Sequence, residues 1–317
     1  MTDAIGRLLD DFTAGRRAAL ARAVSIVENQ RPGFDRILGT LHPKIGRARR
    51  LGITGPPGAG KSTLTTRLTE LMRAQGLSVG IIAVDPTSPF TGGALLGDRV
   101  RMESVALDTG VYIRSLATRG ALGGLSGATR DVADVLDAFG FDRILIETVG
   151  VGQSELDVAR TADTTVVVLV PESGDGIQAL KAGLMEIADL FVVNKADRPG
   201  ADRLRKDLDM ALHMRAATAW MPPVLATVAF EGTGLPELLA ALDRHHQYLS
   251  DSGRLAERRK ARLRERVMDV VDQRLRSRLW GDPAVQEWLT AQLDPLHAGT
   301  TTPFAVADAL LNRGGDR

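Results

Sequence analysis

The sequence predicts an α/β domain with a doubly wound, mostly parallel sheet, carrying a helical extension at its N-terminus and a helical arm at its C-terminus. Between residues 48 and 230, short runs of valine, isoleucine and leucine alternate with amphipathic stretches, as expected of parallel strands covered by helices on both faces. After His245 no strand pattern follows, and a long arginine-rich helical pattern begins. We therefore expect three regions, namely residues 1–46, 47–250 and 251–317.

The composition of the 317-residue chain argues against several classes of protein. Forty basic and 39 acidic residues give a formal charge of +1, which demands no nucleic-acid or membrane partner. The lack of cysteine excludes disulfides, thiolate metal sites and thiol nucleophiles. No apolar run approaches the ~20 residues that span a bilayer, and residues 1–7 lack the apolar core of a signal peptide. We expect a soluble cytoplasmic protein.

The first 30 residues have the periodicity of helices. The apolar residues at helical spacing are Ile5, Leu8, Leu9 and Phe12, and then, after Gly15, Leu20, Val24 and Val27. We expect both apolar stripes to pack on the main domain rather than on a membrane, because acidic residues lie among the basic ones. Pro32-Gly33 and His42-Pro43 punctuate the link to the first strand.

Seven apolar runs are candidate strands. They are Arg50–Thr54, Val79–Val84, Val111–Ser115, Arg143–Thr148, Thr165–Val170, Leu190–Asn194 and Val224–Val228. Helices are expected between them at residues 61–75, 98–107, 126–139, 153–162, 176–188 and 201–216, with a last one at 235–249. Ligands of such sheets bind at the carboxyl ends of the strands, so functional residues should directly follow the strands.

The first candidate strand is followed directly by Gly55-Pro56-Pro57-Gly58-Ala59-Gly60-Lys61-Ser62, which fits the phosphate-binding pattern GxxxxGK[ST]. Its glycines let the backbone curl so that several N–H groups point at one anion, and the helix that follows adds its positive dipole end. Lys61 would reach the β- and γ-phosphates, and the Ser62 hydroxyl would bind Mg²⁺. We predict that residues 55–63, including Thr63, bind a nucleoside triphosphate.

A second motif predicts that the base is guanine. Asn194-Lys195-Ala196-Asp197 follows the strand Leu190–Asn194. In GTP-binding proteins the aspartate of this tetrapeptide accepts hydrogen bonds from the N1–H and the exocyclic amine of guanine, a pair that adenine cannot supply. Val228 and Ala229 occupy the place where such proteins direct backbone N–H groups at the guanine oxygen.

Further polar residues at strand ends are candidates for magnesium binding and catalysis. Glu147 can hold Mg²⁺ directly or through water, and the Gly150 N–H can meet the γ-phosphate. Asp85 and Asp98 are expected near the γ-phosphate, in outer Mg²⁺ contacts and in placing the attacking water. Gln153 could orient that water. The alternatives are a strand-end ion pair for Glu147, a helix cap for Asp98 and an ordinary loop residue for Gln153.

Residues 254–280 form one long helical pattern, which Trp280-Gly281-Asp282-Pro283 ends, and shorter helical stretches follow near 284–293 and 303–312. Its apolar residues recur every four positions, at Leu263, Val267, Val271, Leu275 and Leu279. The basic residues of its first half could indicate nucleic acid, but the interspersed Glu257 and Glu265 favour a solvated face. The apolar stripe favours contact with a second subunit.

Together these motifs resemble the MeaB/ArgK family of P-loop GTPases, which belong to the SIMIBI class. The resemblance covers residues 15 to about 250 and, more loosely, the tail. It rests on Gly55–Ser62, Val84–Ser88, Thr91–Gly93 with Leu96–Arg99, Glu147–Glu155, Ser173–Asp175 and Asn194–Asp197, of which Glu147–Glu155 is the most specific.

The resemblance implies a GTPase that chaperones an adenosylcobalamin-dependent acyl-CoA mutase, typically methylmalonyl-CoA mutase. Because no residue looks like a dedicated strong base and no arginine finger is obvious, we expect intrinsic hydrolysis to be slow and to be stimulated by the partner. GTP would gate the loading of adenosylcobalamin, which belongs to the mutase, and would protect the mutase from inactivation. The resemblance also implies a homodimer held by the C-terminal arm. It places Lys61, Ser62, Asp85, Asp98 and Glu147 at nucleotide and Mg²⁺ contacts. It places Asp175, Gln178 and Lys181 in a third switch, the loop after the fifth strand, which relays the nucleotide state to the mutase.

Other functions stay open. An ATP-dependent kinase of a transport-related binding protein would use the same phosphate loop, although Asn194–Asp197 argues against ATP. A metal-insertion GTPase would need cysteine and histidine clusters, whereas this chain has no cysteine and five scattered histidines. A structural dimer with a vestigial site would not hydrolyse GTP. No arginine finger is obvious, and Arg114, Arg119 and Arg130 are the candidates.

Overall fold

The computed structural model describes residues 2–86, 102–118, 124–148, 158–171, 183–214 and 219–314. The chain divides into two compact units, Met1–Arg262 and Leu263–Arg317.

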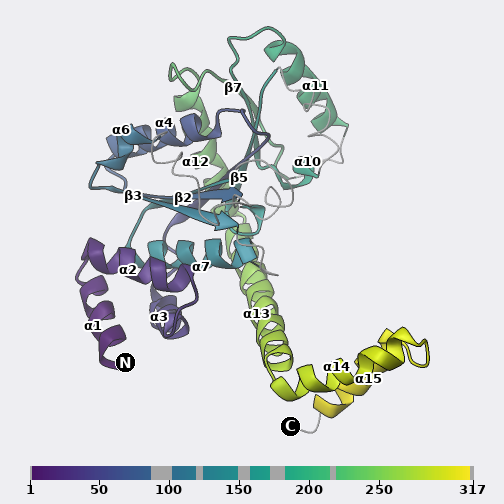
Figure 1. The fold of residues 1–317 in the computed structure, drawn as a ribbon. Coiled ribbons are helices and arrows are strands. Elements are labelled where there is room, and N and C mark those ends of the chain that lie inside the picture. The colour runs from purple at the N-terminus through teal and green to yellow at the C-terminus, as the bar shows by residue number, and fades with distance from the viewer. Residues whose placement is uncertain are drawn as a thin grey trace. The chain divides into compact units, whose positions relative to one another are not determined.

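The first unit is built around a seven-stranded sheet in which neighbouring strands pair in parallel (Figure 1). Its strands are β1 (Arg49–Thr54), β2 (Val79–Pro86), β3 (Val111–Thr118), β4 (Arg143–Thr148), β5 (Thr164–Leu169), β6 (Leu190–Asn194) and β7 (Val224–Thr227). Their order is β3-β2-β4-β1-β5-β6-β7, so β1 lies in the middle of the sheet, between β4 and β5. All seven predicted strands are confirmed, and the strand order changes direction beside the end of β1, where such sheets bind ligands.

Helices cover both faces of this sheet (Figure 1). On one face, α4 (Lys61–Ala74), α6 (Glu103–Ala106) and α12 (Leu235–Asp251) share a buried core with residues of the strands, such as Ile81. On the other face, α7 (Gly124–Phe139) and the N-terminal helices share a second core that contains Ile82. Successive side chains of a strand point to opposite faces, which explains why neighbouring isoleucines of β2 enter different cores. A third cluster involves α10 (Leu184–Ile187) and α11 (Ala201–His213).

The N-terminal helices pack on the main domain, as the sequence predicts. They are α1 (Thr2–Thr13) and α2 (Arg17–Glu28), and their apolar stripes join the core around α7. The ring of Phe12 meets the edge of Phe139 at 5.0 Å between centroids. The link to β1 contains a helix that the sequence analysis missed, α3 (Phe34–Leu41), followed by the 3₁₀ turn η1 (His42–Lys44). Helix α3 has eight residues, which are too few to show a clear helical period of apolar residues, but its Ile37 and Leu41 are fully buried.

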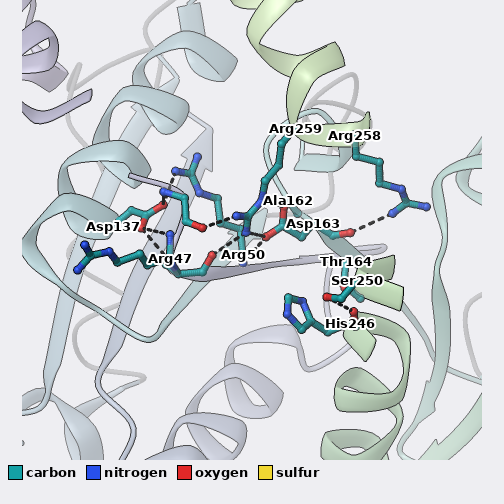
Figure 2. A network of polar contacts seen from close by, with 12 residues as sticks. Arg47, Arg50, Asp137, Ala162, Asp163, Thr164, His246, Ser250, Arg258 and Arg259 are labelled. Carbon is teal, nitrogen blue, oxygen red and sulfur yellow. Dashed lines mark hydrogen bonds and ion pairs between the residues drawn. The ribbon is translucent and has the colours of Figure 1, made fainter. Parts of the chain in front are cut away.

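Helix α13 (Arg254–Trp280) begins in the first unit, and three arginines attach its first turns to residues beside the sheet. Figure 2 shows two of them, Arg258 and Arg259. The guanidinium of Arg258 binds the carboxylate of Asp189 at 2.9 and 3.1 Å. Arg259 and Arg262 bind the carboxylate of Asp163 at 2.8 and 2.5 Å. Asp163 and Asp189 directly precede β5 and β6, so they lie at the amino edge of the sheet. The expected solvated face is therefore wrong for these three arginines, which are internal ion-pair partners.

Buried charge surrounds this attachment. Burial by itself would raise the pKa of Asp163, but the hydrogen bonds and charges of Arg259 and Arg262 outweigh it and hold the pKa well below its usual range. Beside it, the carboxylate of Asp137 accepts the successive backbone N–H groups of residues 46–48 at 2.8 to 3.0 Å (Figure 2). Arg50 donates to Asp137 at 3.0 Å. These contacts fix the chain where it enters β1.

The second unit consists of the remainder of α13, α14 (Pro283–His297) and α15 (Pro303–Gly314). The three predicted helices are confirmed. Four of the five residues of the apolar stripe of α13 are exposed in the single chain, from 47% at Leu263 to 64% at Val267, and Leu279 is half-buried. In the described ranges, no helix is both long enough and apolar enough to cross a bilayer.

Candidate functional site

The loop between β1 and α4 is shaped by glycines that no other residue could replace without strain. Gly55 has φ +136°, and a Cβ there would lie 2.0 Å from the carbonyl oxygen of Val168 on β5. Gly60 has φ +84°, and a Cβ there would lie 2.4 Å from Nδ2 of Asn194. The loop is therefore packed closely against β5 and the end of β6, with its backbone curled ahead of the first turn of α4.

Lys61 places its charge inside this loop. Its side chain is buried, and Nζ donates to the carbonyl oxygens of Gly55 and Pro56 at 2.7 and 2.8 Å. An ammonium held by the loop backbone at the N-terminus of a helix makes the loop suited to an anion.

Ser62 and Glu147 come together at the end of β4. The Ser62 hydroxyl donates to Oε1 of Glu147 at 2.6 Å, and Glu147 is only 7% exposed. Next to them, Thr148 donates to the hydroxyl of Thr54 at 3.0 Å. A hydroxyl and a carboxylate are the hard oxygen ligands that Mg²⁺ takes, so this donor pair fits the predicted metal site.

Asn194 joins three segments of the chain. Its side chain is 2% exposed, and Nδ2 donates to the carbonyl oxygen of Ala59 in the phosphate loop at 2.8 Å. Its Oδ1 accepts from the hydroxyl of Thr227 at 3.0 Å and from the N–H of Ala229 at 3.1 Å. The end of β6 thereby connects the phosphate loop to the loop after β7.

The two other polar residues of the same motif are more open to solvent. Lys195 is half-buried and has a left-handed backbone, with φ +55°. Asp197 is exposed. The backbone N–H of Ala196 donates to the carbonyl oxygen of Thr227 at 3.0 Å, which fixes the turn to β7. Asn194 thus organises the site from within, while Asp197 is accessible to a ligand.

The loop after β7 uses both of its predicted backbone donors within the protein. The Val228 N–H donates to the carbonyl oxygen of Thr233 at 3.0 Å, and the Ala229 N–H donates to Asn194. The N–H groups of Glu231 and Gly232 both reach the carbonyl oxygen of Val228 at 3.0 Å, which closes a tight turn. Thr227, which the sequence analysis did not single out, belongs to this arrangement, and its place directly before Val228 is the only local signal for it.

Of the remaining candidate residues for metal binding, catalysis and switching, the structure describes only some. Asp85 lies at the carboxyl end of β2, one residue beyond Val84, which pairs in register with Thr148 of β4. Its backbone is thus at the same edge of the sheet as Glu147. Outside the described residues lie Asp98, Gly150, Gln153, Asp175, Gln178 and Lys181, together with Arg119 and most of the helices expected at 153–162 and 176–188.

The two described arginine-finger candidates are built into the fold. Arg114, on β3, forms an ion pair with Glu28 of α2. Arg130 lies buried in α7.

Comparison with known proteins gives consistent matches over most of the chain. The family model of methylmalonyl Co-A mutase-associated GTPase MeaB matches residues 20–284. A putative GTPase of Pyrococcus horikoshii is 51% identical over 271 residues, 84% of this chain and 86% of that protein. GTPase ArgK of Escherichia coli is 36% identical over 298 residues, 91% of this chain and 90% of that protein. A crystal structure described as LAO/AO transport system kinase aligns with a TM-score of 0.73 and 29% identity, over 98% of this chain and 97% of that one.

Proposed function

Because this chain belongs to the MeaB family of GTPases, we propose that its GTP hydrolysis assists an adenosylcobalamin-dependent acyl-CoA mutase, with methylmalonyl-CoA mutase as the first candidate. The family supports guanine nucleotide as the ligand and a GTP hydrolase as the activity. We also propose which residues carry out each step, that a magnesium ion takes part, and which partners the chain has.

The observation that carries the site assignment is the position of Asn194. Its amide bonds the phosphate loop on one side and the loop after β7 on the other. A nucleotide whose phosphates lie on the loop Gly55–Ser62 would therefore have its base beside residues 194–197. We assign the reading of guanine N1–H and the exocyclic amine to Asp197, because its carboxylate is exposed there.

The chemistry at the phosphate end follows from the buried groups. Lys61 would neutralise charge on the β- and γ-phosphates by turning its ammonium from the loop carbonyls to the ligand. Ser62 and Glu147 would hold Mg²⁺, which would supply positive charge to stabilise the phosphates. Asp85 and Asp98 are proposed for outer contacts to the metal and for placing water, and Gln153 for orienting that water.

The partner assignments rest on the family and on surface chemistry. We propose a homodimer formed through the C-terminal arm, because the arm exposes an apolar stripe along α13 that a second copy would cover. We propose that Asp175, Gln178 and Lys181 relay the nucleotide state to the mutase. The adenosylcobalamin would be bound by the mutase and not by this chain.

Co-purification tests the proposed partner. The chain should retain a cobalamin-dependent mutase, and a non-hydrolysable GTP analogue should change the amount retained relative to GDP. Asp197→Asn should bind magnesium and phosphates normally but should lose the preference for GTP over ATP and xanthine nucleotides. Failure to retain any such mutase in either nucleotide state would refute the chaperone function, whereas an unchanged base preference would refute the role of Asp197 alone.

A second candidate follows from the structure described as LAO/AO transport system kinase. A kinase of a transport-related binding protein would use the same phosphate loop with ATP. Titration calorimetry with both nucleotides separates the two candidates. ATP binding equal to or tighter than GTP binding would favour the kinase, and a clear preference for GTP would exclude it.

A further inference from the structure

One arginine of α4 holds the loop after β7 from outside, and we propose that Arg67 is a positioning residue for guanine recognition. The inference rests on the proposed guanine site at Asp197. It adds a residue that lies outside the phosphate and guanine motifs and far from the guanine motif in sequence, on the second turn of the helix that follows the phosphate loop.

Arg67 connects two elements that flank the site. Its Nη2 donates to the carbonyl oxygen of Phe230 at 3.0 Å, and its Nη1 donates to Oε2 of Glu70 at 2.9 Å. The other oxygen of Glu70 accepts from the hydroxyl of Ser104, in α6, at 2.8 Å. The planar guanidinium can serve both acceptors at once because its donors lie in a fixed fork. Arg67 is thus held by Glu70 while it holds the loop.

Phe230 is one of the residues of this loop, with Thr233 and Gly234, whose backbone N–H has no acceptor among the residues that the structure describes, and it is the one next to Ala229. The N–H groups of Val228, Ala229, Glu231 and Gly232 all have acceptors within the chain. For the Phe230 N–H, no residue in the described ranges accepts a hydrogen bond, and the Phe230 side chain is 79% exposed. Its neighbour Ala229 is bonded to Asn194, three residues before Asp197, so this free N–H lies beside the proposed base site.

The chemistry of guanine fits such a donor. Guanine presents an oxygen at position 6, where adenine presents an amine. A backbone N–H directed at that position favours guanine and leaves adenine with two facing donors. The carbonyl of Phe230, held by Arg67, limits the rotation of the residue that carries this N–H. Loss of Arg67 should therefore weaken the contact to O6 without removing the contacts that Asp197 makes.

The test compares base analogues that report the two contacts separately. Inosine triphosphate keeps O6 but lacks the exocyclic amine, so the ratio of GTP to ITP affinity reports Asp197. 6-Thio-GTP keeps N1–H and the amine but replaces O6 with sulfur, a weaker acceptor, so the ratio of GTP to 6-thio-GTP affinity reports the Phe230 N–H. Dissociation constants are measured by titration calorimetry on the full chain with Mg²⁺.

Arg67→Ala should weaken GTP and ITP binding by the same factor, about three- to tenfold for one hydrogen bond. The GTP to ITP ratio should stay at its wild-type value, and the GTP to 6-thio-GTP ratio should fall towards one. Glu70→Gln should shift the same ratio in the same direction by a smaller factor, because Glu70 only orients Arg67. Arg73→Ala is the matched control, since Arg73 lies on the same helix and binds Asp108 and the carbonyl oxygen of Leu77 instead. It should leave both ratios unchanged.

A wild-type GTP to 6-thio-GTP ratio in Arg67→Ala would overturn the inference. It would arise either from unchanged affinities or from an equal loss of affinity for all three nucleotides, which would indicate a general disturbance of the site. A wild-type chain that does not distinguish GTP from ITP would refute the proposed guanine site itself, and the inference with it, so the two failures are separable.

Discussion

Replacing Asn194 with alanine should damage the site even when no nucleotide is present. The substitution removes one bond to the phosphate loop, one to Thr227 at the end of β7 and one to Ala229 in the loop after β7, at 2.8, 3.0 and 3.1 Å. It leaves buried partners without the amide, among them Thr227, which is fully buried. At about 0.5–1.5 kcal/mol for each net hydrogen bond, the loss of unfolding free energy should be about 2–4 kcal/mol. For a domain of this size that corresponds to a fall in Tm of roughly 5–10 °C.

Thermal unfolding of the nucleotide-free protein measures this effect, and calorimetry with GTP measures the loss of affinity. Thr227→Val serves as the partial control, since it removes only one of the bonds and should cost about 1 kcal/mol. The double variant should cost less than the sum of the two single variants, because both remove the same contact. If Asn194→Ala unfolds like wild type in the absence of nucleotide and only its GTP affinity falls, Asn194 acts by ligand contact alone and the organising role is refuted.

Three further predictions concern the ionisable side chains of Lys61, Asp163 and His246. Lys61→Ala should abolish GTP binding in calorimetry because the phosphates lose their ammonium partner, and wild-type affinity would sink the phosphate-site assignment. Asp163→Asn should cost about 3–5 kcal/mol in urea unfolding because it leaves the partly buried guanidinium charges of Arg259 and Arg262 without their carboxylate partner, whereas Asp243→Asn, which removes an exposed pair with Arg49, should cost at most about 1 kcal/mol. Burial, and secondarily the charge of Arg49, lowers the pKa of His246 from 6.5 to about 4. Between these values only the unfolded chain binds the proton, so stability should fall as pH falls through this window, and His246→Gln should flatten that slope.

The sheet could be predicted from the sequence because its strands are nearly continuous apolar runs. β5 and β6 are buried along their whole length, so their pattern does not depend on which neighbour they meet. The phosphate loop is equally local, since the turn itself demands glycine at positions such as Gly55. The ends of the strands differ from the predicted ends by only a few residues; for example, β2 extends to Pro86.

The attachment of α13 could not be predicted, because it depends on residues far apart in the chain. Arg258 and Arg259 bind carboxylates that lie 69 and 96 residues away. A basic helix face has the same sequence pattern whether it faces water or buried aspartates. The available signal was on the other side, in Asp163 and Asp189, which each stand directly before a buried strand. Acidic residues so placed need partners, and only the folded chain shows which arginines supply them.

Strand β6 connects the two groups of polar contacts on which the site depends. Its amino end follows Asp189, which is bonded to Arg258, and its carboxyl end is Asn194, which holds the phosphate loop and the loop after β7. All five residues of β6, Asn194 included, are buried, and packed strands in such cores deform little. The side chain of Asn194 is therefore fixed in position by the sheet before any ligand binds. A site fixed in this way loses less conformational entropy when it orders around a nucleotide. Because the bonds of Asn194 are present before any nucleotide binds, their loss should be detectable in the nucleotide-free protein.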